Sequence, residues 1–487
     1  MIIPKEVKSI IKTLEDKGFE AYAVGGCVRD FLRAVVPNDW DVTTSARPED
    51  IQKLFPHNFY NNKFGTVTVI NNKAKDENLR NIEITTYRID TGYSDKRHPD
   101  QVIFTPNLKE DLARRDFTIN AMALKVESRK SVKSKAAYEI IDPFVGQEDL
   151  KNKTIRAVGD AGKRFNEDAL RMLRAVRFSA QLGFEIEKGT LDAIEKNRDL
   201  LKFVSEERIR DEFSKIILSD RPYEGVELLR KTGLLRYIVP ELEAGIGVSQ
   251  NRHHIYTIYE HSVLSLKFCP SPKLEVRLAA LLHDIAKPQT KAGSGPDATF
   301  YNHDFVGAKF TEKILSRLKY PGSVIKLVSL LVKNHMFYYN VDEVSEAGVR
   351  RLISRVGKEN LKDLMDLRIA DRLGSGVPKA KPYKLRHLEY LIHKVSKDPI
   401  SPKMLKVNGK DIMDILKIEP SKKVGLILDV LLSEILEDPK RNTKKYLTKR
   451  IKELNMLSPE EIEKSQKVIQ EKKEEEDLKD KSKFWVK

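Results

Sequence analysis

Residues 114–124 read RRDFTINAMAL, and this stretch decides how the rest of the chain is interpreted. It begins with Arg114, Arg115 and Asp116 and continues into small and apolar residues. Two guanidinium groups beside a carboxylate can bind phosphates, and the carboxylate can orient a guanidinium. Taken alone, the same residues are a plain ion-pair cluster on a surface, so their meaning depends on the rest of the chain.

Two aspartates upstream indicate metal-dependent chemistry. Asp39 and Asp41, in NDWDVTT (38–44), are separated by one residue, and on a strand such side chains point to the same face. Glu83, in the neighbouring predicted strand, is the natural third carboxylate. Two Mg²⁺ ions held there would activate an attacking oxygen and stabilise a leaving pyrophosphate. An isolated Asp-X-Asp sequence is more often a surface loop, so the context again matters.

Gly25 and Gly26 supply part of that context, because they follow a predicted strand over residues 19–24. Two glycines let the backbone approach a triphosphate closely, and a helix that begins near Val28 has a positive N-terminus. Arg29 is predicted to contact phosphate or to form a structural ion pair. An ordinary strand-to-helix turn is the alternative for the glycines. Further strands are predicted at 65–71, 82–88 and 101–104.

In order and spacing, five motifs resemble those of class II tRNA nucleotidyltransferases and bacterial poly(A) polymerases, which extend RNA 3′ ends without a template. The motifs are GGCVRD (25–30), NDWDVTT (38–44), RRDFTINAMAL (114–124), FNEDALRMLRAVRF (165–178) and SEERIRDEF (205–213). The resemblance implies an α+β fold with a polymerase-β-like nucleotidyltransferase head and helical domains after it. It makes Asp39 and Asp41 the Mg²⁺ ligands, and it places Arg114, Arg115, Asp116 and Asn120 at the nucleotide. Phe31-Leu32-Arg33-Ala34 replaces the family's common Leu-Leu-Gly, which affects helix packing more than chemistry.

The fourth motif is predicted to select the base. Asp168 and Arg171 are three residues apart on a predicted helix and would share one face. The aspartate can accept from an exocyclic amine and the arginine can donate to ring acceptors, so cytosine and adenine would be selected. A routine helical salt bridge is the alternative, but Arg174 and Arg177 continue the motif as in the family. The fifth motif resembles the helix that supports the base-reading one, through Glu207, Arg208 and Glu212.

The polar stretch 90–107 resembles the flexible loop with which these enzymes switch from C to A addition. This argues against an enzyme that adds only cytidines, and changes within 92–100 are predicted to spare C addition and depress A addition.

Four histidines and two aspartates in the second half resemble the ligand set of HD-type metal phosphohydrolases. They are His261, His283, Asp284, His303, His335 and Asp371. Imidazoles and carboxylates that converge from several helices suit a transition metal such as Ni, Mn, Fe or Zn. A single helical histidine is more often a core residue, but the complete set favours a metal site. Some related enzymes use this domain as a phosphodiesterase or phosphatase and others only to hold tRNA, so its activity stays open.

The whole chain has 487 residues, of which 33% are charged and 40% hydrophobic, as in a soluble protein of two to four domains. The net charge of +16 suits a polyanionic partner, although lysine-rich proteomes also give basic proteins. No apolar run approaches the roughly 20 residues of a membrane helix, and two cysteines exclude a disulfide scaffold. A cytoplasmic location without membrane contact is expected.

The predicted domains are a catalytic head over 1–145, a helical neck over 146–235 for base recognition and RNA binding, an HD-type body over 236–380 and a tail over 381–487. The tail resembles the segment that holds tRNA, through Lys410, Lys422 and Lys423, although a solvated lysine face is the alternative for these residues. It ends in a charged extension. We therefore expect a CCA-adding enzyme that uses tRNA, CTP, ATP and Mg²⁺. An A-adding enzyme or poly(A) polymerase is the alternative, although residues 63–67 lack the glycine-basic-basic-Phe segment of the polymerases. In another class, the chain could be an HD phosphohydrolase with a degenerate head, against which the intact aspartate pair argues.

Overall fold

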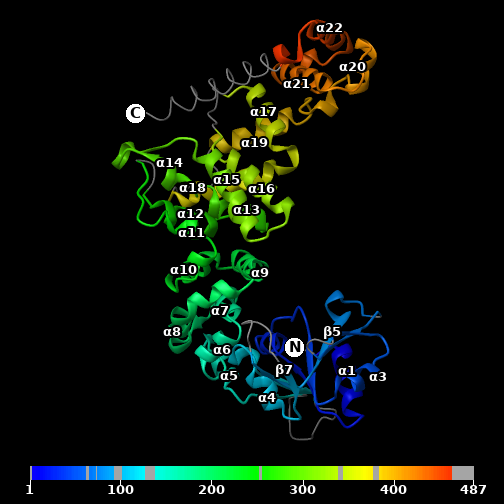
Figure 1. Ribbon diagram of the computed structural model, residues 1–487, viewed down its shortest axis with the longest axis vertical. Helices are drawn as coiled ribbons and strands as arrows, with labels where there is room; N and C mark the ends of the chain where they lie inside the picture. Colours follow the sequence, from blue (N-terminus) through cyan, green and yellow to red (C-terminus); the bar gives the residue numbers. More distant parts are fainter. Residues whose placement is uncertain are drawn as a thin grey trace. The chain divides into compact units, whose positions relative to one another are not determined.

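The computed structural model describes residues 3–61, 65–72, 74–92, 101–126, 138–251, 255–337, 344–376 and 383–462. The chain forms two compact units, Met1–Glu243 with Ser316–Tyr320, and Ala244–Leu315 with Pro321–Lys487 (Figure 1). A mixed α+β head followed by helices confirms the predicted fold class. The predicted loop residues 93–100 and the charged extension after 462 lie outside the described residues. Among those that are described, no helix is long and apolar enough to cross a membrane.

A seven-stranded sheet, with the order β3-β4-β5-β2-β1-β8-β9, forms the centre of the head. Its middle strands are β5 (Asn81–Thr86), β2 (Asp41–Thr44) and β1 (Ala21–Val24), and β2 runs parallel to β5 and antiparallel to β1. The outer strands are β3 (Asn58–Asn61), β4 (Thr66–Ile70), β8 (Ala123–Val126) and β9 (Tyr138–Ile141). The predicted strand at 101–104 is β7 (Gln101–Phe104), which pairs with β6 (Arg88–Thr91) in a separate ribbon.

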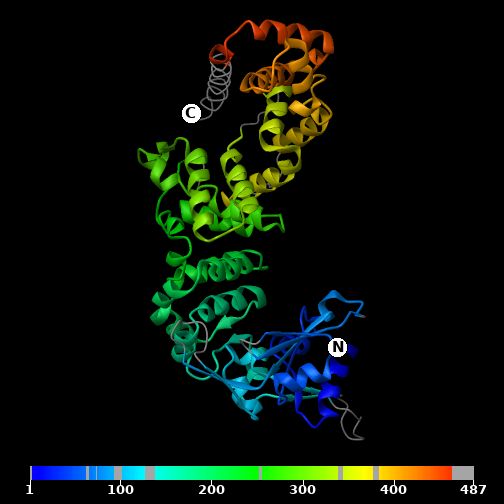
Figure 2. The same cartoon turned by 45° about the vertical axis from the view of Figure 1, so that its right-hand side comes forward.

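The two faces of the sheet have different neighbours, and this difference positions the carboxylates. On one face, Ala23 of β1 and Val42 of β2 pack in a core with α1 (Lys5–Glu15) (Figures 1 and 2). On the other face, Val24 packs with Leu112 of α4 (Leu108–Ala113). Successive side chains of a strand point to opposite faces. Asp41 and Thr43 therefore lie on the α4 side, and so does Glu83, because its neighbours Ile82 and Ile84 belong to the α1 core.

Helices α5 to α11 follow the head within the first unit. Their bounds are α5 (Gly146–Lys151), α6 (Ala161–Glu167), α7 (Leu170–Leu182), α8 (Lys188–Asn197), α9 (Glu206–Ile217), α10 (Pro222–Lys231) and α11 (Pro240–Glu243). Helix α7 packs against both α9 and α10 through buried residues such as Leu173 and Val176. The apolar spacing over 167–182 predicts one continuous helix, and this is wrong at Asp168, where the backbone is extended (φ −141°, ψ 104°) between α6 and α7.

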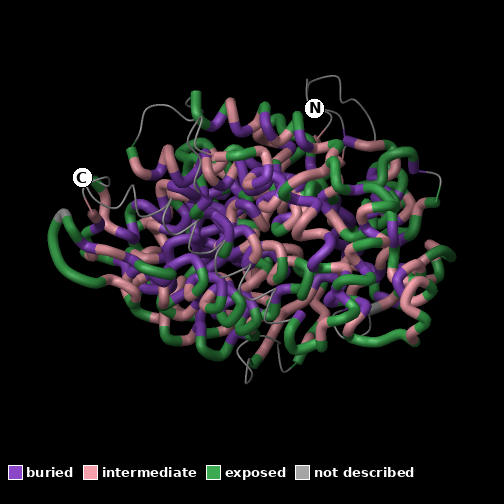
Figure 3. The backbone as a smooth tube through the Cα atoms, turned by 90° about the horizontal axis from the view of Figure 1, so that it is seen from above, coloured by how far each residue is buried: buried purple, intermediate pink, exposed green. Residues whose placement is uncertain are grey.

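The second unit is almost entirely helical. Its principal helices are α12 (Ile258–Lys267), α13 (Leu274–Leu282), α14 (Lys287–Thr290), α15 (His303–Arg317), α16 (Gly322–Asn334), α17 (Glu346–Val356), α18 (Leu361–Gly374) and α19 (Tyr383–Val395). Helices α12, α13, α16 and α18 pack around one another. Figure 3 shows buried and exposed residues alternating along the chain. Helices α20 (Gly409–Leu416), α21 (Lys422–Glu437) and α22 (Lys444–Asn455) share a separate apolar core.

Candidate active site and candidate metal centre

Three carboxylates gather at the middle of the head sheet. Asp41 is directly beside Glu83 in the parallel register of β2 and β5. Asp39 is not on the strand as predicted, because β2 begins only at Asp41 and Asp39 lies exposed just before it. Burial, then the charge of Asp39 and also that of Glu83, raise the pKa of Asp41 to about 6, although Arg115 opposes them. Such mutual repulsion is what bound divalent cations relieve, so the group fits the predicted Mg²⁺ site.

The glycine turn lies against this group. Gly25 has a φ of +85°, which side-chain-bearing residues rarely adopt. A Cβ at Gly25 would lie 3.0 Å from Nη1 of Arg115 and 3.7 Å from Oδ2 of Asp41. Gly26 begins α2 (Gly26–Leu32), with Arg29 beside it. The bare backbone at Gly25 therefore brings the turn, Arg115 and Asp41 to one point.

Arg115 has the properties of a ligand-binding side chain. Its Nε atom is buried and has no hydrogen-bond partner among the described residues. An unsatisfied buried donor costs free energy, and a phosphate oxygen would satisfy it.

Asp111 is a functional candidate that the sequence analysis missed. Its fully buried Oδ1 accepts hydrogen bonds from Nε and Nη2 of Arg114, at 3.0 and 2.8 Å. Its Oδ2 accepts from the hydroxyl of Thr43 at 3.1 Å and lies 3.6 Å from Nη2 of Arg115. Burial alone would raise the pKa of Asp111, but Arg114 and Arg115 hold it below its usual value. In the sequence, Asp111 lies three residues before Arg114 and four before Arg115, within one helical turn, and this spacing could have indicated the contacts.

A chain of hydrogen bonds joins the head to α7. The Arg29 guanidinium donates to both oxygens of Asp30, at 2.9 and 2.8 Å, and to Oδ1 of Asn120 at 2.8 Å. The Asn120 amide donates to Oδ1 of Asp116 at 3.2 Å, and Arg174 donates to Oδ2 of Asp116 at 2.7 Å. Burial would raise the pKa of Asp116, but Arg174 and Arg171 hold it far below its usual range. These predicted nucleotide-binding residues thus form one network in the free protein.

Asp168 and Arg171 do not share one helical face, contrary to the prediction, because Asp168 lies in extended backbone before α7 begins. Asp168 accepts from the backbone N–H of Leu170 at 3.1 Å, which interrupts the helix as short polar side chains commonly do. Its two oxygens also accept from Arg208 at 3.1 and 2.7 Å. Arg171 instead donates to Glu167 and to the carbonyl oxygen of Arg114, both at 2.9 Å.

The fifth motif contacts the fourth directly, as a supporting helix should. Besides the Arg208 contact, Glu212 of α9 accepts from Arg177 of α7 at 2.9 Å, and both side chains are buried. Burial, with the neighbouring Arg174, lowers the pKa of Arg177 to about 10.

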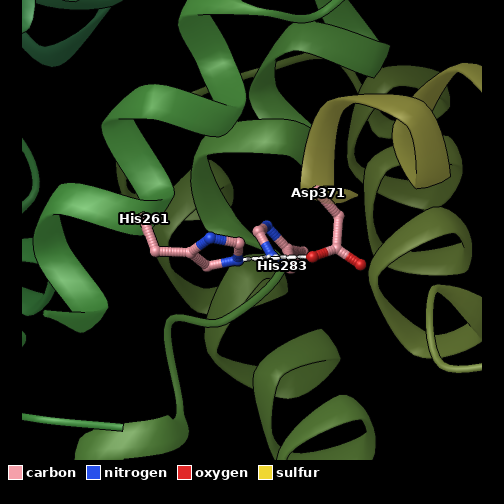
Figure 4. A group of neighbouring side chains, drawn as sticks. All are labelled: His261, His283 and Asp371. Carbon is pink, nitrogen blue, oxygen red and sulfur yellow. Dashed lines mark hydrogen bonds and ion pairs between the residues drawn. The ribbon is translucent and has the colours of Figure 1, made fainter. Parts of the chain in front are cut away.

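The six predicted metal ligands come together in the second unit. They form two groups, His261 with His283 and Asp371, and Asp284 with His303 and His335, and all six are buried. Figure 4 shows the imidazole nitrogens of His261 and His283 turned toward Asp371. The Asp284 carboxylate contacts both groups. Its Oδ2 lies 3.2 Å from Nε2 of His261, and its Oδ1 lies 3.5 Å from Nε2 of His303. Burial would lower the pKa of His261, but Asp284 and Asp371 raise it to about 9.

The hydrogen bonds of two imidazoles, His303 and His335, fit a bound cation. Nδ1 of His303 and Nδ1 of His335 lie 2.7 and 2.6 Å from the carbonyl oxygens of Phe300 and Val332. A carbonyl only accepts, so each Nδ1 carries a proton, and in the neutral imidazole each Nε2 presents a lone pair. These two Nε2 atoms are 3.3 Å apart, where lone pairs repel unless a cation lies between them. Burial lowers the pKa of His303 to about 4, which keeps it in the neutral, metal-binding form.

Lys287 is a second residue that the sequence analysis missed. Its ammonium lies 2.7 Å from Oδ2 of Asp284 and donates to Gln250 at 2.7 Å. The side chain is 8% exposed, so this cation belongs to the wall of the cluster. Lys287 lies three residues after Asp284, within one helical turn, and this spacing could have indicated their ion pair.

Comparison with known proteins finds family matches over both the head and the second unit. Family models match the chain as a Poly A polymerase head domain over residues 21–156 and as an HD domain over residues 258–375. A model described as a probable RNA and SrmB-binding site of polymerase A matches residues 183–246.

Among curated relatives, the A-adding tRNA nucleotidyltransferase of Deinococcus radiodurans is 35% identical over 430 residues, which are 84% of this chain and 90% of that protein. The CCA-adding enzyme of Lactobacillus helveticus is 48% identical over 226 residues, 46% of this chain. The match spans only 53% of that enzyme, about half its length. Among solved structures, the Bacillus stearothermophilus CCA-adding enzyme in complex with CTP matches with a TM-score of 0.67 and 27% identity, over 93% of this chain and 98% of that one.

Proposed function

The chain belongs to the family of poly(A) polymerases and tRNA nucleotidyltransferases, and on that premise we propose that it is a CCA-adding tRNA nucleotidyltransferase. It would act in the cytoplasm, on tRNA, CTP and ATP. The observation that carries the proposal is the meeting of Asp41, Glu83, Arg115 and the Gly25 turn on one face of the head sheet. Nucleotide-addition chemistry needs carboxylates for metal ions beside donors for a triphosphate, and this face offers both.

In the proposed reaction, the 3′-hydroxyl of the RNA attacks the α-phosphate of CTP or ATP. A phosphodiester bond forms, the bond to the β-phosphate breaks, and pyrophosphate leaves. Asp39, Asp41 and Glu83 would hold Mg²⁺, which when bound activates the attacking oxygen and stabilises the leaving group. Arg114 and Arg115 would donate to triphosphate oxygens in the orientation that Asp111 fixes.

Base selection is assigned to Asp168 and Arg171 at the start of α7. Arg208 donates to both oxygens of Asp168 and the Leu170 N–H donates to Oδ1, so Oδ2 keeps a lone pair that can accept from an exocyclic amine. Cytosine and adenine carry that amine next to a ring acceptor, whereas uracil and guanine do not present the same pattern.

An A-adding enzyme is the second candidate, because the Deinococcus radiodurans relative that matches most of the chain is A-adding. The test supplies each NTP separately, with Mg²⁺, to tRNAs that end before CCA, after C and after CC. A CCA-adding enzyme extends the first two with C and the third with A. Addition of A to the third alone would replace the proposal with A addition, and unlimited A addition would indicate a poly(A) polymerase.

The second unit supports a further, separate activity. We propose that the six-residue cluster binds transition-metal ions, with Asp284 shared between two ligand groups, and that it hydrolyses phosphate esters such as 2′,3′-cyclic phosphates. The facing lone pairs of His303 and His335 support metal binding. A metal bound there would supply an activated water, and Lys287 would balance negative charge on the substrate.

A further inference from the structure

Helix α19 carries an exposed row of aromatic and basic side chains. Leu385, Leu388, Leu391 and Val395 are the buried side of this helix. The opposite side includes residues at three- and four-residue steps, namely Tyr383, Arg386, His387, Tyr390, His393 and Lys394. We call these six residues the α19 row. Tyr383 is 63% exposed and Tyr390 is 58% exposed, so neither ring contributes much to the core.

The rings of the α19 row form a regular series. Tyr383 and His387 have ring centroids 6.0 Å apart with 30° between their planes, and His387 and Tyr390 are 6.0 Å apart with 37° between theirs. The helix therefore carries three rings at three- and four-residue steps, the first pair stacked and the second pair tilted. A buried packing role would not leave two tyrosines more than half exposed.

The charge of the row is positive. On this helix Lys384, Arg386 and Lys394 carry positive charge, against the single carboxylate of Glu389, three residues after Arg386. Glu346 of α17 forms an ion pair with Lys394 at 2.6 Å, which fixes that end of the row against α17. An apolar protein partner would be matched by aliphatic neighbours, whereas rings interleaved with cations suit a polyanion that has planar groups.

We propose that the α19 row binds unpaired bases of an RNA, which stack on Tyr383, His387 and Tyr390 while Arg386 contacts the backbone phosphate. Unpaired bases are required because a duplex hides the base faces that stack on rings. The identity of the RNA as the tRNA substrate rests on the proposed function, but the stacking itself does not.

The test measures tRNA binding without any nucleotide, so that it is independent of nucleotide addition. Tyr383→Ala with Tyr390→Ala should weaken tRNA binding about tenfold or more, since each stacked base contributes substantially. Tyr383→Phe with Tyr390→Phe keeps the rings and should bind as the parent does. Phe268→Ala is the matched control, because Phe268 is 41% exposed in the same unit and also has a lysine, Lys267, over its ring. It should leave the affinity unchanged.

Two competitors complete the experiment. A single-stranded oligoribonucleotide should displace tRNA from the parent better than a blunt RNA duplex does, and the double alanine variant should lose this preference. A folded alanine variant that binds tRNA as tightly as the parent would overturn the inference. So would a phenylalanine variant as weak as the alanine one. If the alanine variant instead changes only the oligomeric state, the row is a protein interface. A parent that binds tRNA through the row but adds no nucleotide would overturn the proposed function and leave this inference standing.

Discussion

At the scale of single residues, the head is organised by carboxylates with different surroundings. Asp41 faces other carboxylates and has a raised pKa, whereas Asp111 and Asp116 face arginines and have lowered ones. A carboxylate such as Asp41 would be stabilised by cations from outside the chain, whereas Asp111 and Asp116 position the chain's own arginines. This difference separates the proposed metal ligands from the residues that orient them.

Replacement of Asp39 or Asp41 tests whether these carboxylates are metal ligands. Asp39→Ala or Asp41→Ala should abolish nucleotide addition and leave the affinity for tRNA nearly intact, because metal binding is lost and RNA docking is not. Single-turnover addition and nucleotide-free tRNA binding should be measured on the same preparations. Turnover retained by either variant would contradict the assignment.

Replacement of Asp111 tests whether a buried carboxylate orients the arginines. Asp111→Asn removes the buried charge that faces Arg114 and Arg115, so the free energy of unfolding should fall by about 3 kcal/mol at neutral pH. The KM for NTP should rise because both guanidinium groups lose their orientation. Thr43→Val, which removes only one hydrogen bond to the same carboxylate, is the milder companion and should change the KM less.

The pH dependence of stability follows from the lowered pKa of Asp111. A carboxylate whose folded-state pKa lies below its unfolded value of about 3.9 stabilises the protein above that pH. This stability is lost as the pH falls through the folded pKa. Below about pH 4, the parent should therefore lose stability more steeply than Asp111→Asn, as measured by denaturant unfolding at several pH values. Parallel curves would show that Asp111 is not charged in the native state.

At the scale of elements, strand alternation allowed more to be predicted than helix periodicity did. Alternation correctly placed Asp41 beside Glu83 on one face of the sheet, but Asp39 lies before β2, where alternation does not apply. The apolar spacing of α7 was also visible, but its start was not, because Asp168 ends the helical pattern through a local hydrogen bond. Its partner Arg208 lies forty residues away, and no local pattern indicates such a contact.

Arg171 lies at the junction of α6 and α7, and its replacement tests the proposed role of this junction in base selection. Arg171→Ala should reduce discrimination among the four NTPs, because buried polar groups left unpaired by the wrong base enforce the choice. Initial rates with each NTP on a tRNA that ends after C give the measurement. Arg230→Ala, on the neighbouring α10, is a control that removes an ion pair to Glu227 away from the motif. Equal loss of rate for all four NTPs would make Arg171 a structural residue.

At the scale of the whole molecule, the chain carries two candidate centres of different chemistry in two separate compact units. The head offers carboxylates, which suit Mg²⁺, whereas the second unit offers four imidazoles, which suit softer transition metals. A chain with two such centres should respond to metals and to substitutions independently at each one.

His283→Ala combined with Asp284→Ala separates the centres. His283 belongs to one ligand group and Asp284 contacts both, so the double variant should lose bound transition metal and any hydrolysis of 2′,3′-cyclic phosphate. Mg²⁺-dependent nucleotide addition should be largely unchanged, because the head contributes none of these ligands. Metal content, both activities and a melting curve should be measured on one preparation, with Asp39→Ala as the reciprocal variant that keeps its transition metal. A folded double variant that retains its metal would show that the cluster is not the binding site. If the double variant loses its metal and the parent has no hydrolase activity, the cluster is a structural metal centre that stabilises the packing of α12, α13 and α18.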